Sequence, residues 1–167
     1  QEFMIVPHGI ETFKEQLRAG SEIYQCLGKI LKDKGLSCGV GDEGGFAPNL
    51  QNDEAALACI MEAVFLAGYN ENQVGIALDV ASIEWVKDGK YTLKKSGKVM
   101  NANELCDYYE RLCAKYPIMS IEDGVGEDDF EGWKMLTNRF KDRIKLVGDD
   151  LFFIYTKRFN EGVEKGI

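Results

Sequence analysis

Apolar and polar residues follow two patterns along the chain. One pattern predicts strands, the other predicts helices, and the two alternate. Short, continuously apolar runs such as Val-Gly-Ile-Ala-Leu-Asp are typical of strands buried on both faces. We expect strands at 1–7, 74–79, 118–123 and 144–150. Longer segments with apolar residues at three- to four-residue steps predict helices over 10–34, 53–68, 103–116, 127–140 and from 156 onward.

The helical spacing also predicts which side chains form each apolar face. In the first two helices these are Phe13, Leu17, Tyr24, Leu27 and Leu31, then Leu57, Ile60 and Val64. In the later helices the inward residues are expected to be Leu105, Tyr109 and Leu112, then Phe130, Trp133 and Leu136, and finally Phe159 and Val163. Gly35 is placed to end the first helix, and Asp53 and Thr156 are placed to cap helices. Asp88-Gly89 predicts a hairpin within 84–93.

Buried strands that alternate with amphipathic helices predict a parallel sheet with right-handed crossovers. This order fits either an open doubly wound sheet or part of a (β/α)8 barrel. We count about four core strands, whereas a complete barrel has eight and usually about 250 residues. The chain has 167 residues, so any barrel is expected to be partial.

Three predicted strands end on acidic residues, namely Asp79, Glu122 and Asp149. The carboxyl ends of parallel strands share one end of a sheet, so these carboxylates are expected to converge. Crowded carboxylates repel one another, and a hard cation removes that cost. Oxygen ligands without His or Cys favour Mg²⁺. The alternative is that these acids are helix caps or solvated loop residues; Asp123 and Asp150 are expected to be capping or supporting residues.

Composition and charge narrow the class of protein. The chain is 45% hydrophobic, and its 28 acidic against 20 basic residues give a net charge of -8, which disfavours binding to nucleic acid or anionic membranes. No apolar run approaches the length of a membrane span. Five irregularly spaced cysteines and a single histidine exclude a zinc finger and indicate free thiols in a reducing compartment.

A glycine-rich segment at 39–49 carries Asp42 and Glu43 between glycines. It matches neither a Walker loop nor a dinucleotide-binding fingerprint. We interpret it as a mobile acidic loop that closes over a site; a structural turn is the alternative.

Five segments in order resemble enolase (phosphopyruvate hydratase) over essentially the whole chain. They are Gln-Glu-Phe-Met at 1–4, Gly-Asp-Glu-Gly-Gly-Phe-Ala-Pro-Asn at 41–49, Leu-Asp-Val-Ala-Ser at 78–82, Ser-Ile-Glu-Asp at 120–123 and Gly-Asp-Asp-Leu at 148–151. Gly124 and Thr-Lys-Arg at 156–158 resemble bacterial members more than animal or yeast ones. The resemblance implies that residues 1–167 are part of the C-terminal barrel domain, a partial (β/α)8 barrel with one small hairpin.

The resemblance also implies an activity, the reversible Mg²⁺-dependent dehydration of 2-phosphoglycerate to phosphoenolpyruvate in glycolysis. It assigns Asp79, Glu122 and Asp149 to the Mg²⁺ ion. Glu43 would be the general acid with Glu2 beside it, and Asp42 and Gln1 would support them. Glu2, Glu43, Glu122 and Asp149 would lie at the substrate. A cytoplasmic homo-oligomer, with a secondary cell-surface or secreted pool, is also implied for the full-length protein.

The chain lacks the family's N-terminal domain and the later barrel strands that carry the catalytic lysine and a histidine. No lysine present lies in a matching motif, so we assign no base and expect these 167 residues alone to be inactive. His8 is interpreted as an incidental loop residue. The alternative function is a non-catalytic half-barrel that acts as a binding or oligomerising module, for example by binding plasminogen at the cell surface.

Overall fold

The computed structural model describes residues 1–167 and divides the chain into two compact units. One unit contains Gln1–Met4 and Ile76–Ile167, and the other contains Ile5–Gly75. Each unit has its own buried apolar side chains. No helix is both long and apolar enough to cross a membrane.

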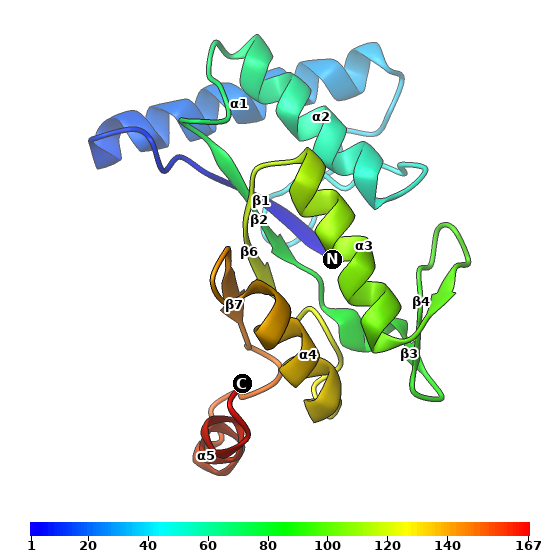
Figure 1. The fold of residues 1–167 in the computed structure, drawn as a ribbon. Helices are drawn as coiled ribbons and strands as arrows, with labels where there is room; N and C mark the ends of the chain where they lie inside the picture. The colour runs from blue at the N-terminus through cyan, green and yellow to red at the C-terminus, as the bar shows by residue number, and fades with distance from the viewer. The chain divides into compact units, whose positions relative to one another are not determined.

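The main sheet has four strands in the order β1-β2-β6-β7: β1 (Glu2–Val6), β2 (Gly75–Asp79), β6 (Ile118–Glu122) and β7 (Lys145–Val147). The β2–β6 and β6–β7 pairs are parallel. β1 lies beside β2 and runs in the opposite direction (Figure 1). The α/β class and the four predicted strands are therefore confirmed, but the sheet is mixed. The reversed β1 brings its first residue, Glu2, to the end of the sheet where β2 and β6 finish.

Two helices pack on each other in the unit formed by Ile5–Gly75. α1 (Phe13–Asp33) begins after Thr12, whose Oγ1 accepts the Glu15 N–H at 3.2 Å, and it stops before Gly35, which has a φ of +68°. α2 (Asp53–Leu66) is capped by Asn52 and not by Asp53 as predicted, because the Asn52 Oδ1 accepts the Ala55 N–H at 2.9 Å.

The apolar face predicted for α2 is confirmed, whereas the one predicted for α1 is largely solvent-exposed. Leu57, Ile60 and Val64 of α2 are buried. Of the residues predicted for α1, Leu31 is buried and Leu27 is half-buried, but Phe13, Leu17 and Tyr24 are exposed. The other buried residues of α1 are Ala19, Ile23 and Ile30. Helical spacing thus located the helix but did not define the part of its apolar surface that packs.

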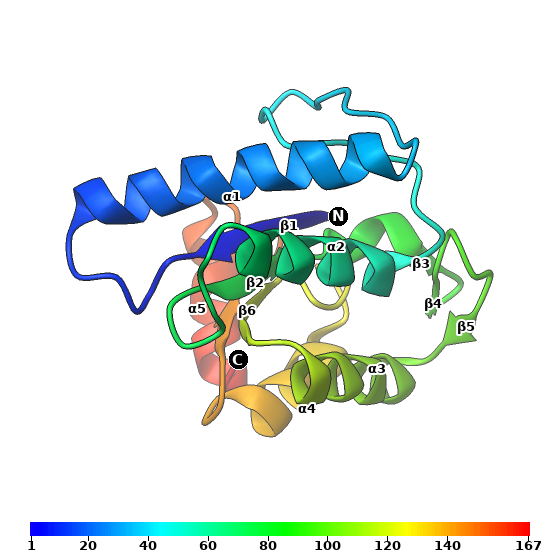
Figure 2. The ribbon, with the colours of Figure 1, turned by 90° about the horizontal axis from the view of Figure 1, so that it is seen from above.

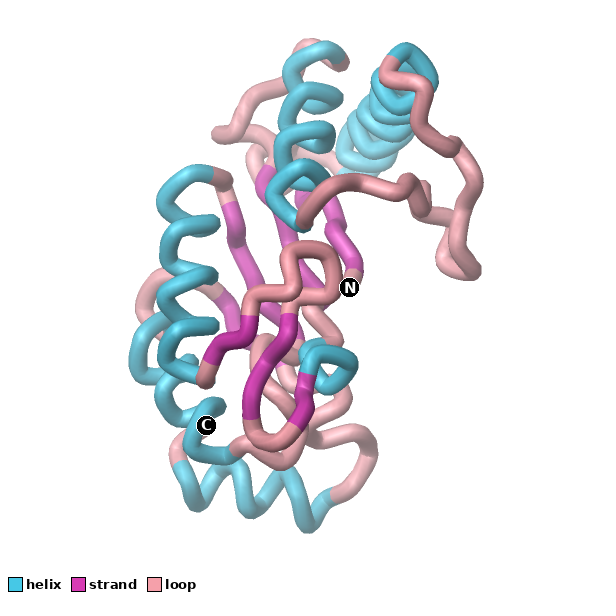
Figure 3. The backbone as a smooth tube through the Cα atoms, turned by 90° about the vertical axis from the view of Figure 1, so that its right-hand side faces the viewer, coloured by secondary structure: helices cyan, strands magenta, loops and turns pink.

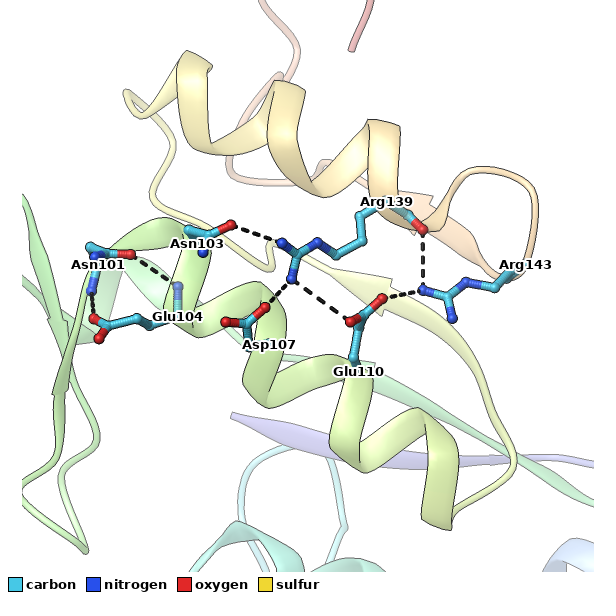
Figure 4. A network of polar contacts seen from close by, with 7 residues as sticks. All are labelled: Asn101, Asn103, Glu104, Asp107, Glu110, Arg139 and Arg143. Carbon is cyan, nitrogen blue, oxygen red and sulfur yellow. Dashed lines mark hydrogen bonds and ion pairs between the residues drawn. The ribbon is translucent and has the colours of Figure 1, made fainter.

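In the larger unit, α3 (Ala102–Lys115) and α4 (Phe130–Phe140) lie side by side (Figure 2). All of the side chains predicted to face inward from these helices are buried except Phe130, which is half-buried. A polar network joins the exposed sides of the two helices (Figure 4). In this network Arg139 binds Asp107 and, at 2.8 Å, Asn103, while Arg143 binds Glu110 at 2.8 Å.

A second, antiparallel sheet follows β2 in the chain (Figure 3). After a 3-10 turn, η1 (Ser82–Trp85), come β3 (Val86–Lys87), β4 (Lys90–Thr92) and β5 (Val99–Met100). Asp88 and Gly89 both have positive φ, 53° and 70°, as the predicted two-residue turn requires. The hairpin is thus confirmed, and β5 adds a strand that the sequence pattern did not indicate.

The last helix, α5 (Thr156–Lys165), corrects two expectations. Its N-cap is Tyr155 without a side-chain cap, and Thr156 is its first helical residue. Phe159 and Val163 are 54% and 63% exposed. Gly162 is buried instead: a Cβ there would lie 2.5 Å from the Phe152 ring, so the missing side chain lets this ring approach the helix.

Candidate metal centre

Two of the predicted ligands lie side by side at the carboxyl end of the main sheet. Asp79 ends β2 and Glu122 ends β6, and the two residues are paired in the parallel register. Glu122 is also paired with Val147 of β7, and Asp149 follows Val147 by two residues. Since neighbouring strands are about 4.8 Å apart, this register brings the predicted carboxylates to one end of the sheet.

Backbone hydrogen bonds continue beyond the strands and hold the loops that follow them. The Val80 N–H donates to the Glu122 carbonyl at 2.9 Å, and the Asp123 N–H donates to the Val147 carbonyl at 3.0 Å. Ala81 and Asp123 both have a φ of 45°, in the left-handed region that non-glycine residues rarely adopt. The Ala81 N–H then donates to the Asp79 Oδ1 at 3.1 Å. This last bond orients the Asp79 carboxylate.

The tightest group of carboxylates consists of Asp79, Glu122 and Asp123, whose candidate ligand atoms all lie within 4.8 Å of one another. Asp79 and Glu122 are half-buried, and Asp123 is 4% exposed. This donor set contains only carboxylate oxygens. Such donors fit a hard divalent cation such as Mg²⁺, and do not favour zinc or copper.

Electrostatics at Glu122 reflect this crowding. Burial raises the pKa of Glu122 above its ordinary value, and the negative charges of Asp79, Asp123, Asp149 and Glu2 raise it further, in that order. Asp149 and Glu2 therefore lie close enough to influence Glu122, although they are outside the tightest group. A bound cation would relieve the repulsion that raises this pKa.

Asp123, which was expected to be a capping or supporting residue, has a second set of contacts with the turn that follows β7. Its carboxylate accepts the backbone N–H groups of Asp149, Asp150 and Leu151 at 3.1, 2.9 and 3.5 Å. Burial raises the pKa of Asp123, and the Asp150 and Leu151 amides oppose that rise. The sequence pattern does not indicate how close Asp123 lies to Asp79 and Glu122. The only sequence feature that could have placed Asp123 at the site is that it follows Glu122 directly. The left-handed backbone that turns its side chain cannot be read from the sequence.

The acidic loop expected to contribute the general acid belongs to the unit formed by Ile5–Gly75. An isolated antiparallel bridge pairs Val40 with Phe46 across this loop, and the Phe46 ring stacks on Tyr24 with 4.3 Å between ring centroids. The Tyr24 hydroxyl donates to the Gly44 carbonyl at 2.9 Å. Asp42 and Glu43 are exposed at the tip of this loop. Their roles, and the supporting role of Gln1, stay predictions.

The fold and site together define a class: an α/β barrel segment with acidic residues gathered at the carboxyl end of its strands. The whole chain, residues 1–167, matches the family described as enolase, C-terminal TIM barrel domain, and it belongs to that family. A protein named Enolase from a Nitratiruptor species is 54% identical to it over 168 residues. The match covers 100% of this chain but 40% of that relative, so the chain spans less than half of the relative's length.

Proposed function

We propose that this chain is part of an enolase that interconverts 2-phosphoglycerate and phosphoenolpyruvate with Mg²⁺. The observation that supports this proposal most strongly is the pairing of Asp79 with Glu122 at the ends of β2 and β6, in a chain that belongs to the enolase barrel family throughout. We propose Asp79, Glu122 and Asp149 as the ligands. The ion, when bound, would stabilise negative charge that develops on the substrate when a proton is removed beside its carboxylate.

The remaining proposed roles concern proton transfer to the substrate by acidic residues of this chain. Glu43 is proposed to donate a proton to the departing 3-hydroxyl group, with Glu2 beside it at the substrate and with Asp42 and Gln1 in support. Glu2 is suited to this role because its charge already acts on Glu122. A general acid must lie within hydrogen-bond reach of the group that it protonates. The base is not assigned to any residue of this chain, so the 167 residues alone are expected not to turn over substrate.

The ligand and acid roles can be separated by two variants of the protein that carries this chain. Asp149→Ala is expected to lower Mg²⁺ affinity, measured by calorimetry, and turnover of 2-phosphoglycerate, measured by product absorbance, in parallel. Glu43→Gln is expected to retain Mg²⁺ affinity and lower kcat. Glu131→Gln, an exposed carboxylate on α4, is the control and should change neither quantity. An Asp149→Ala variant with unchanged Mg²⁺ dependence would refute the ligand assignment.

The same family resemblance supports further expectations for the whole protein. We propose that it forms a homo-oligomer and works in the cytoplasm, with a secondary pool at the cell surface or outside the cell. Cell fractionation and the mass of the native assembly in solution test these expectations independently of the metal site.

A further inference from the structure

Asp123 links the end of β6 to the loop that follows β7. Its Oδ1 accepts the N–H groups of Asp149 and Leu151, and its Oδ2 accepts that of Asp150. Three consecutive amides therefore converge on one carboxylate that is 4% exposed. An ionised carboxylate offers about four acceptor positions, so these amides use most of its capacity.

We propose that Asp123 is a positioning residue of the metal centre, which acts through Asp149 and does not bind the ion itself. This inference rests on the proposed function, since it concerns the same Mg²⁺ site. Asp149 is exposed and lies in a loop, whereas Asp79 and Glu122 are fixed by strand pairing. Strand pairing does not fix the position of Asp149. The Asp123 carboxylate fixes it instead, by accepting the backbone N–H groups of Asp149 and of the two residues after it.

The alternative to a positioning role is that Asp123 binds the ion directly. An Asp123 oxygen lies within 4.8 Å of oxygens of Asp79 and Glu122, which is close enough for all three to hold one ion. An ion bound there would compete with the three amides for the same oxygens. The two arrangements differ in one measurable respect: a positioning residue loses its effect when Asp149 is removed, and a ligand does not.

The test uses Mn²⁺ as the probe, with its affinity measured by electron paramagnetic resonance on the protein that carries this chain. Asp123→Asn is expected to weaken Mn²⁺ binding by about 10- to 100-fold, as is usual for residues that orient ligands. In an Asp149→Ala background, the same substitution is expected to change the affinity by less than about threefold. Hydrogen exchange at the amides of residues 149–151 should become faster in Asp123→Asn.

Asp129→Asn is the matched control. Asp129 also holds local structure, since it accepts the Gly132 N–H at 2.9 Å and the Tyr91 hydroxyl at 2.7 Å. This variant should lose stability and keep its Mn²⁺ affinity. If Asp123→Asn does not fold, Asp123→Ser, which is smaller and uncharged, takes its place in the same cycle.

Two results would overturn the positioning role alone: unchanged Mn²⁺ affinity in Asp123→Asn, or an equally large loss with and without Asp149. The second result would make Asp123 a ligand. A wild-type protein that binds no Mn²⁺ would instead refute the proposed metal site, and the positioning role with it.

Discussion

Tyr91→Phe tests the polar contacts of a buried hydroxyl in the larger unit. Tyr91 is 1% exposed, and its hydroxyl donates to the Asp129 Oδ2 at 2.7 Å while accepting the Gly126 N–H at 3.0 Å. The network joins β4 to the N-terminus of α4 and to the loop that follows Glu122. Burial, reinforced by Asp129, raises the pKa of Tyr91 far above its ordinary value, so the hydroxyl remains a donor throughout the usable pH range.

The expected loss of stability in Tyr91→Phe comes from the hydrogen-bonding groups that the substitution leaves without a partner. A hydrogen bond to a charged group contributes about 1.5–3 kcal/mol, and an unpaired buried N–H, here that of Gly126, costs about 1–3 kcal/mol. These terms overlap, so we expect Tyr91→Phe to lower the free energy of unfolding by about 2–4 kcal/mol.

Urea unfolding followed by tryptophan fluorescence isolates the relevant unit, because both tryptophans, Trp85 and Trp133, lie within residues 76–167. Tyr155→Phe is the control: its side chain is 61% exposed in the same unit, and a change within about 0.5 kcal/mol is expected. A loss below about 0.5 kcal/mol in Tyr91→Phe would refute the assigned network.

Two further predictions concern buried polar atoms. The Ser82 side chain is fully buried and its Oγ has no hydrogen-bond partner. Ser82→Ala should therefore leave the free energy of unfolding unchanged or raise it by up to about 1 kcal/mol. A thermal melt that shows a loss of stability of about 1 kcal/mol would contradict this. Burial raises the pKa of the Cys106 thiol to about 11. Because the unfolded thiol loses its proton at lower pH, near about 8.5, Cys106 should make stability fall by up to about 1.4 kcal/mol per pH unit between these values. Urea titrations from about pH 8 to 11 should show a shallower fall in Cys106→Ala; identical slopes would contradict the assignment.

The sequence by itself determined the local elements and the identity of the candidate ligands. The apolar runs located all four strands of the main sheet, and Asp88-Gly89 located the hairpin turn, because these signals depend on neighbouring residues. The acids that end β2 and β6 were predicted to meet, since parallel pairing imposes that result once the order of elements is known. Family membership followed from motifs that are themselves local.

Only the tertiary structure decided the direction of β1, the packed faces of α1 and α5, and the position of Asp123. Helical spacing shows where apolar residues lie but not which of them another element covers, so Phe13, Phe159 and Val163 are exposed against expectation. Asp123 gained its three amide contacts from residues 26 to 28 positions later in the chain. Contacts between residues so far apart in the chain depend on the order of the strands and on the left-handed backbone at Asp123. Neither can be predicted from the residues next to Asp123.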